Sequence, residues 1–352
     1  MNQPLKDAIK RDYSATEDIY TSFIELGTKL SHNKGNVSFI IPVSWQTGDN
    51  YINTRSFIKN NIHLSKGIVL PYDVFDDVYV DTGLYFFSKN KAQSSFVYEY
   101  SAKDKVSLDS LNNLAFKEIQ NTEWQNTTFL KIVFNVGIRN IQNKFSKLEM
   151  TIGDVTKSVR GILANSSDYS IKKIDSTYKS VFAGKLDRYS IDNEVMFVKY
   201  GENLKEKPSS EDYFKGERIL IRRIISRQFR VMATVTEQDF VNKKDIYVFK
   251  LNDPEFVSKY LLAIINSRLI SFLKTNASNS AKKDDFTQLT LGDIREIRIP
   301  KIPIKAQMEY VKLVDKIILG KTKGIETNEF ENILDLMIYK LYDLTEEEIE
   351  IV

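Results

Sequence analysis

A buried strand that ends in a proline stands near the N-terminus, in the stretch KGNVSFIIPVSWQTG (residues 34–48). The run Val37–Ile41 is apolar except for Ser38, and a polar segment with Trp45 follows Pro42. A short apolar run between a Lys-Gly-Asn turn and a proline is typical of a strand inside a sheet covered on both faces. Because ligand sites in α/β sheets lie beyond the carboxyl ends of strands, the segment after Pro42 is a candidate site.

The first 90 residues predict one part of an α/β sheet. A capping box of Ser14 and Glu17 indicates the start of a helix. Its expected inward face is Ile19, Phe23, Leu26 and Leu30. The expected elements are helix 14–30, strand 37–41, helix 51–60, strand 67–70 and a long strand within 74–88. Alternating helices and strands indicate an α/β sheet, which three strands do not complete.

Beyond the polar stretch 88–95, which we interpret as a domain boundary, short strands predominate. They are expected at 96–100, 195–199, 219–225, 229–235 and 246–250, with a helix at 255–273. Two amphipathic helices, 304–319 and 329–342, follow Pro300 and Pro303. The predicted organisation is a partial Rossmann-like α/β sheet at 1–90, an α+β domain at 91–302 and C-terminal helices at 303–352.

The charge distribution is uneven, although the net charge of the chain is only +3. Residues 326–352 hold nine acidic residues and one lysine, a balance of −8, which leaves +11 for the rest. A basic body favours an anionic partner, nucleic acid first, and solvated surface lysines are the alternative. With no Cys and only two His, no metal site is expected. No apolar run approaches the roughly 20 residues of a membrane span, and no signal peptide is recognisable, so we expect a soluble cytoplasmic protein.

Several stretches, taken in order, resemble the adenine-N6 DNA methyltransferases of restriction-modification systems. EDIYTSFIELGTKLSHNKGNVSFIIPVSWQTG (17–48) is similar to the helix and strand after that family's catalytic motif, and VFDDVYVDTGLYFF (74–87) to a later strand. Four later stretches resemble a TaqI-like C-terminal specificity domain: FAGKLDRYSI (182–191), ERILIRRIISRQFRVMAT (217–234), YLLAIINSRLISFLK (260–274) and LTLGDIREIRIPKIP (289–303). The closing LDLMIYKLYDLTEEEIEIV (334–352) is similar to the C-terminus of large fused restriction-methylation enzymes.

The resemblance implies a DNA-reading half attached to the last part of a methyltransferase sheet. In this family the target adenine leaves the duplex and is received by an aromatic side chain. Phe75 matches the position that stacks on the extruded base, and an ordinary core phenylalanine is the alternative. Ser44, Trp45 and Thr47 are expected to border the same pocket, with a packing role for Trp45 as the other interpretation.

Two motifs that the family needs do not occur in this sequence. One is the glycine loop that approaches S-adenosylmethionine, and the other is Asn-Pro-Pro-Tyr, which holds the adenine. None of the 14 glycines forms a G-x-G, and none of the seven prolines is adjacent to another. We therefore expect no complete catalytic set here, and expect S-adenosylmethionine and catalysis to come from a protein partner or a missing N-terminal segment. A non-catalytic specificity subunit and a structural subunit of a restriction complex are the alternatives.

Basic residues of three segments are the predicted contacts with double-stranded DNA. Residues 215–230 hold six basic residues and one acidic, and their arginines can pair with phosphates or guanine edges. For residues 215–230 the alternative is a solvated hairpin. For Lys185 and Arg188 it is a structural turn held by Tyr189, and for residues 274–286 it is a flexible surface loop. The predicted contacts are Lys185, Arg188, Arg222, Arg223, Arg227, Arg230, Lys274, Lys282 and Lys283.

Overall fold

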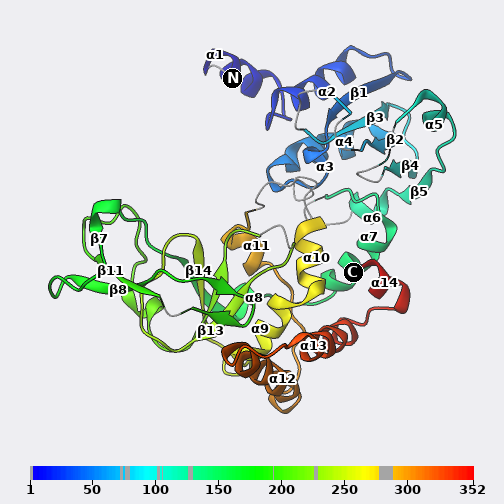
Figure 1. Ribbon diagram of the computed structural model, residues 1–352. Coiled ribbons are helices and arrows are strands. Elements are labelled where there is room, and N and C mark those ends of the chain that lie inside the picture. The colour runs from blue at the N-terminus through cyan, green and yellow to red at the C-terminus, as the bar shows by residue number, and fades with distance from the viewer. Residues whose placement is uncertain are drawn as a thin grey trace. The chain divides into compact units, whose positions relative to one another are not determined.

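The structure is a computed structural model that describes residues 3–71, 74–75, 80–100, 104, 106–125, 130–192, 194–225, 229–276 and 288–352. The chain divides into two compact units (Figure 1). Unit 1 is built from Met1–Arg139, and unit 2 from Asn140–Asn276 and Lys283–Val352. None of the helices within the described residues is long and apolar enough to cross a membrane.

Unit 1 is a mixed α/β structure on a five-stranded sheet with the strand order β1-β3-β2-β4-β5. β2 and β4 are parallel, and the other neighbours are antiparallel. The strands are β1 (Asn36–Pro42), β2 (His63–Val69), β3 (Thr82–Ser88), β4 (Ser94–Glu99) and β5 (Lys117–Gln120). Because β4 pairs with β2, the boundary expected at 88–95 falls inside unit 1.

The helices of unit 1 begin with α1 (Gln3–Asp12) and α2 (Ile19–Leu30). The Ser14–Glu17 capping box is wrong, because Asp18 caps α2 and completes a box with Thr21. Glu17 instead accepts hydrogen bonds from the backbone of Asn53 and Thr54. The remaining elements are α3 (Ser44–Thr47), η1 (Asp49–Tyr51), α4 (Ile52–Asn61), α5 (Leu108–Asn112), α6 (Thr122–Gln125) and α7 (Val136–Ser146), which continues into unit 2.

Helix α2 turns a different face to the core than its apolar pattern predicts. Phe23 is 50% exposed and Leu30 is 78% exposed, whereas Ile24 and Glu25 are buried. A Cβ atom at Gly27 would lie 2.9 Å from Cγ1 of Val37, so the glycine allows α2 to approach β1 closely. Three residues of the expected inward face, Ile19, Phe23 and Leu30, are therefore exposed on unit 1, and Leu26 is half-buried.

The strand expected within 74–88 is shorter than predicted. β3 begins at Thr82, which pairs with Pro42 at the end of β1. Val74 and Phe75 lie in an exposed bend before it, and residues 76–79 lie outside the described residues. The main core of unit 1 lies on one face of β2 and β3, with Trp45, Ile58, Leu64, Tyr85 and Phe87 among its most buried side chains. A smaller cluster around Ile68 and Leu84 lies on the other face.

Unit 2 contains three antiparallel sheets, in the strand orders β13-β12-β14-β6, β7-β11-β8 and β10-β9. The strands predicted at 195–199 and 246–250 are confirmed, whereas the one predicted at 219–225 ends at Arg222 and the one predicted at 229–235 begins at Ala233. The strands are β6 (Thr156–Arg160), β7 (Tyr169–Ser170), β8 (Tyr178–Phe182), β9 (Leu186–Asp187), β10 (Ser190–Ile191), β11 (Val195–Lys199), β12 (Arg218–Arg222), β13 (Ala233–Thr236) and β14 (Ile246–Leu251).

Helices cover one side of the four-stranded sheet of unit 2 (Figure 1). The helix expected at 255–273 is two helices, because Ser267 adopts an extended conformation between them. Leu334 and Ile338 of the helix predicted at 329–342 are buried in the core, whereas Ile333 is 40% exposed. The elements are α8 (Ile152–Val155), η2 (Ser166–Asp168), η3 (Glu211–Phe214), α9 (Ser258–Asn266), α10 (Arg268–Asn276), α11 (Leu291–Arg295), α12 (Ile304–Thr322), α13 (Asn328–Leu341) and α14 (Glu346–Ile351).

Candidate nucleic-acid interface

The segment after β1 folds back on itself as the short helix α3. Ser44 lies at its start, and its hydroxyl is 3.0 Å from the hydroxyl of Tyr20. Trp45 and Thr47 are buried. Arg55 holds the turn by donating from Nη1 to the carbonyl oxygens of Trp45 and Gly48, at 2.7 and 2.8 Å. The structure thus brings three of the four predicted pocket residues together on one helical turn.

Trp45 is a packing residue in this structure. Its indole is fully buried and meets the ring of Tyr85 edge-on, with centroids 5.0 Å apart, and the ring of Phe87 at 5.9 Å. Burial raises the pKa of the Tyr85 phenol, so this hydroxyl stays protonated and donates to Oε1 of Gln46 at 3.1 Å. A base stacked on Trp45 would have to displace these rings.

Phe75 lies apart from this packed cluster. Its side chain is 41% exposed, and it makes no ring contact with Trp45 in the described part of unit 1. An exposed ring that the core does not use is free to receive another flat surface. This exposure fits the stacking role predicted for Phe75.

Two of the predicted DNA contacts, Arg188 and Arg230, point into an ionic cluster on α13. Arg188 donates to Glu331, and Nη2 of Arg230 lies 3.9 Å from Oδ2 of Asp335 and 2.8 Å from the Asn266 carbonyl. Burial lowers the pKa of Arg230 to about 10. Because both guanidinium groups are mostly buried and already paired, they have little charge to offer a phosphate.

Tyr189 holds the turn that carries Arg188, as expected if this turn has a structural role. Tyr189 has a φ of +62°, which is unusual for a residue with a side chain. Its ring is buried, and its backbone N–H donates to Ala233 at 2.8 Å, so packing supports the strained conformation. Lys185, on the same hairpin, is exposed and forms a surface pair with Asp187 at 2.6 Å.

Arg222 and Arg223 end β12 with their charges more available. Arg222 forms no ion pair with any residue that the structure describes, and its Nη1 atom lies 3.5 Å from the sulfur of Met232. Arg223 donates to Gln288 at 2.5 Å, and its nearest carboxylate, Asp245, is 3.9 Å away. A neutral amide leaves the guanidinium charge in place, so both arginines can meet a phosphate.

The remaining predicted contacts lie on or beyond α10. Lys274 is half-buried on the last turn of that helix. Arg227, Lys282 and Lys283 lie outside the described residues.

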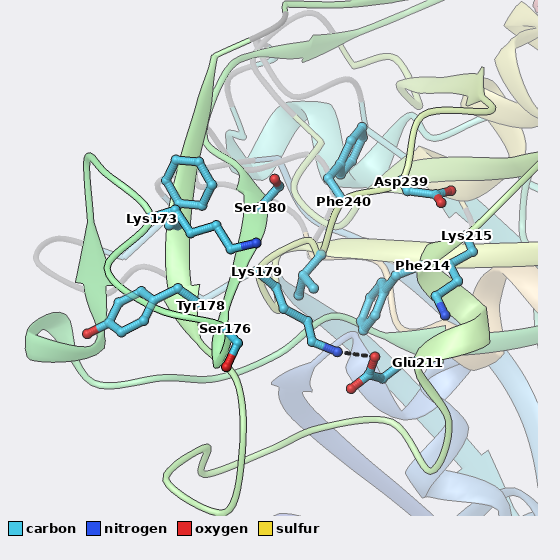
Figure 2. A pocket seen from close by; sticks show the side chains of 12 residues that line it. Lys173, Ser176, Tyr178, Lys179, Ser180, Glu211, Phe214, Lys215, Asp239 and Phe240 are labelled. Atoms are coloured by element: carbon cyan, nitrogen blue, oxygen red, sulfur yellow. Dashed lines mark hydrogen bonds and ion pairs between the residues drawn. The ribbon is translucent and has the colours of Figure 1, made fainter.

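A pocket of about 340 Å³ opens between β8 and η3 of unit 2 (Figure 2). Sequence patterns did not predict it, because its lining comes from segments far apart in the chain. Lysines and aromatic rings dominate this lining: Lys173, Ser176, Tyr178, Lys179, Ser180, Phe197, Glu211, Phe214, Lys215, Asp239, Phe240 and Val241. The run of lysines before β8 was the single local signal that could have drawn attention to it.

Arg218 holds one wall of this pocket in place. It is fully buried, and it donates to the carbonyl oxygens of Gly216, Gln238 and Phe240 at 2.9, 2.7 and 3.2 Å. Its guanidinium also lies 4.8 Å from the ring centroid of Phe240. Burial lowers the pKa of Arg218 to about 10. Arg218, one of the six basic residues of 215–230, is thus a structural clamp rather than a surface cation.

Two family models match the chain. The model of the Eco57I restriction-modification methylases matches residues 1–75, and the model of the TaqI-like C-terminal specificity domain matches residues 179–304. A protein of Methanocaldococcus jannaschii described as a type II restriction enzyme and methyltransferase is 33% identical over 355 residues. The alignment covers 96% of this chain and 30% of that protein, so the chain spans about a third of the relative's length.

A solved structure has the same fold. The Type IIL restriction-modification enzyme MmeI, determined in complex with DNA, superposes with a TM-score of 0.62 at 8% identity. The superposition covers 99% of this chain and 54% of the MmeI chain. The chain is therefore related to the restriction-modification methylases, and residues 179–304 match a TaqI-like C-terminal specificity domain.

Proposed function

We propose that the chain recognises target DNA and forms part of the base pocket of an S-adenosylmethionine-dependent adenine-N6 DNA methyltransferase. The observation that carries this proposal is one chain with a methylase match at 1–75 and a specificity-domain match at 179–304. Duplex DNA is the partner that suits a specificity domain, and DNA is present in the MmeI structure. In this proposal β1, β2 and β3 are the last part of a Rossmann-like methyltransferase sheet.

The distribution of charge in unit 2 supports DNA as the partner. Arg222 has no ion pair among the described residues, Arg223 has only the exposed Asp245 at 3.9 Å, and Lys185 is exposed in the same unit. Arginine forks pair with phosphate oxygens and with guanine edges, so these residues can fix register and contribute to recognition. Arg188 and Arg230 stabilise the same unit from inside through α13.

Methyl transfer needs a second polypeptide or segment in this proposal. β1 is at the edge of its sheet and pairs only with β3 among the described residues. Ile40 of β1 and Phe23 of α2 are both about half exposed, which leaves a free strand edge beside apolar surface. Such an edge is normally covered or paired. We infer that the covering strand belongs to the part that brings the glycine loop and the Asn-Pro-Pro-Tyr motif, and with them S-adenosylmethionine.

Phe75 is the proposed platform for the extruded adenine. Its exposed ring would stack on the base, and α3 would form the neighbouring wall through Ser44. The fully buried Trp45 and the buried Thr47 would support that wall from behind.

The test is DNA binding as a function of salt. Fluorescence anisotropy with a labelled duplex should give an affinity that falls steeply with salt, because each phosphate contact releases counterions. The same affinity at all salt concentrations, or no binding to any duplex, would refute DNA recognition by this chain. Binding without methylation in any mixture would instead favour a non-catalytic specificity subunit.

A further inference from the structure

The pocket beside β8 combines aromatic walls with cations. Its volume of about 340 Å³ lies at the lower end of the range for small-ligand pockets, about 300–1,000 Å³. Ser180 and Phe197 are paired across β8 and β11, so their side chains share one face of the sheet. Phe214 and Phe240 are buried and form the apolar wall opposite.

The two carboxylates at the pocket already have partners within the fold. Glu211 is paired with Lys179, as the dashed line in Figure 2 marks. Asp239 accepts a hydrogen bond from the backbone N–H of Gly216 at 2.9 Å. Lys179 neutralises Glu211, whereas Asp239 keeps its charge, so the three lysines and two carboxylates of the lining leave a net charge of +1.

Lys173 and Lys215 are the other two lysines of the lining, and they approach the pocket from different sides (Figure 2). Lys173 forms no ion pair within the described ranges of the chain. Lys215 has its nearest carboxylate oxygen, of Asp212, at 4.0 Å, and both side chains are mostly exposed. Weak exposed pairs contribute little, so both ammonium groups are available to an anion.

The loop between β7 and β8, which supplies Lys173, also presents apolar side chains to solvent. Ile171 is 82% exposed and Ile174 is 64% exposed. Asp175 keeps the loop folded by accepting from the N–H and the hydroxyl of Thr177, at 2.7 and 2.5 Å. Apolar side chains flanked by lysines suit contact with the sugars and bases of a nucleic acid.

We propose that this pocket binds one nucleotide, with its base against Phe197 and its phosphate between Lys173 and Lys215. Aromatic rings stack on any base, because every base has a π-face, and lysine ammonium groups bind phosphate as point charges. The nucleotide is either free in solution or an unpaired nucleotide of DNA, and the second source rests on the proposed function. The site lies within unit 2 and is separate from the base pocket proposed at Phe75 in unit 1.

The experiment uses two fluorescent probes, 2-aminopurine deoxyribonucleoside monophosphate and a duplex with one unpaired 2-aminopurine. Stacking on Phe197 should quench either probe on binding. K173Q/K215Q should weaken that binding by at least about tenfold, since it removes two charge-assisted contacts. F197L should keep the fold and lose the quenching. K312Q, which replaces an exposed lysine of α12 outside the pocket, is the matched control and should bind as wild type does.

The outcomes separate the two sources and the two proposals. Quenching of the monophosphate identifies a free nucleotide, and quenching of the unpaired duplex alone identifies a nucleotide of DNA. The proposal is overturned if neither probe is quenched, or if K173Q/K215Q binds both as wild type does. A fully paired duplex, followed by anisotropy in parallel, reports on DNA recognition itself and does not depend on this pocket.

Discussion

Replacing Arg222 and Arg223 together by glutamine should flatten the salt dependence of DNA binding without unfolding the protein. Each phosphate contact contributes about 0.9 to the slope of log affinity against log salt, so losing two contacts lowers the slope by about 1.8. Between about 50 and 200 mM salt this difference amounts to about tenfold in affinity. Both side chains can be shortened safely, because their contacts are the Met232 sulfur, the Gln288 amide and a surface pair with Asp245 at 3.9 Å.

The matched control is Arg188→Gln in the same unit. Arg188 is paired with the buried Glu331, so its loss should lower the free energy of unfolding by about 3 kcal/mol. Removing one partner of a buried ion pair costs about 3–5 kcal/mol. The lower value applies because Lys321 still lies 2.8 Å from Glu331. Its salt slope should equal that of wild type.

The assay is fluorescence anisotropy of a labelled duplex over the salt range, with urea unfolding for stability. An unchanged slope for the Arg222 and Arg223 double variant would refute their contact with phosphate. A changed slope for Arg188→Gln with unchanged stability would refute the division of the arginines into surface and structural groups.

Three further changes test the packing, the base pocket and the ionic cluster. Trp45→Ala should lower the free energy of unfolding by about 3–5 kcal/mol in urea denaturation followed by circular dichroism, and an unchanged midpoint would contradict its packing role. Phe75→Ala should cost less than about 1 kcal/mol, yet reduce the fluorescence of an extruded 2-aminopurine in the assembled enzyme; an unchanged signal would remove Phe75 from the pocket. Burial alone would raise the pKa of Glu331, but Lys321 and Arg188 lower it overall, so its stabilising effect is present above about pH 4.5 and is lost as the pH falls through the lowered value. Glu331→Gln should therefore reduce thermal stability at neutral pH and flatten its fall in acid; an acid limb parallel to that of wild type would argue against this linkage.

Local sequence patterns predicted a helix or strand correctly where only one such pattern was present. The apolar run Val37–Ile41 is β1 as expected, but the prediction that it is buried is wrong, because β1 lies at the sheet edge and Ile40 is 53% exposed. Pro300 and Pro303 precede α12 as expected. The start of α2 was mispredicted because Ser14 and Asp18 are both good N-caps, and Glu17 stands at capping-box spacing from Ser14. The choice depends on Glu17 bonding to Asn53, 36 residues further along the chain.

The candidate site was less predictable, because its properties depend on distant partners. Arg188 and Arg222 look alike in sequence, yet one meets Glu331, 143 residues away, and the other has no ionic partner among the described residues. The orientation of Trp45 depends likewise on Tyr85 of β3. The pocket near β8 joins side chains of four separate segments, 173–180, 197, 211–215 and 239–241, so no short motif indicates it.

The central claim is that this chain binds DNA while another segment supplies the methyl donor and the catalytic residues. A methyl-transfer assay tests this claim most directly. A duplex and labelled S-adenosylmethionine are incubated with the chain alone, with the product of the neighbouring reading frame alone, and with both. We predict label on DNA adenine only when both are present. Label transferred by this chain alone would contradict the claim.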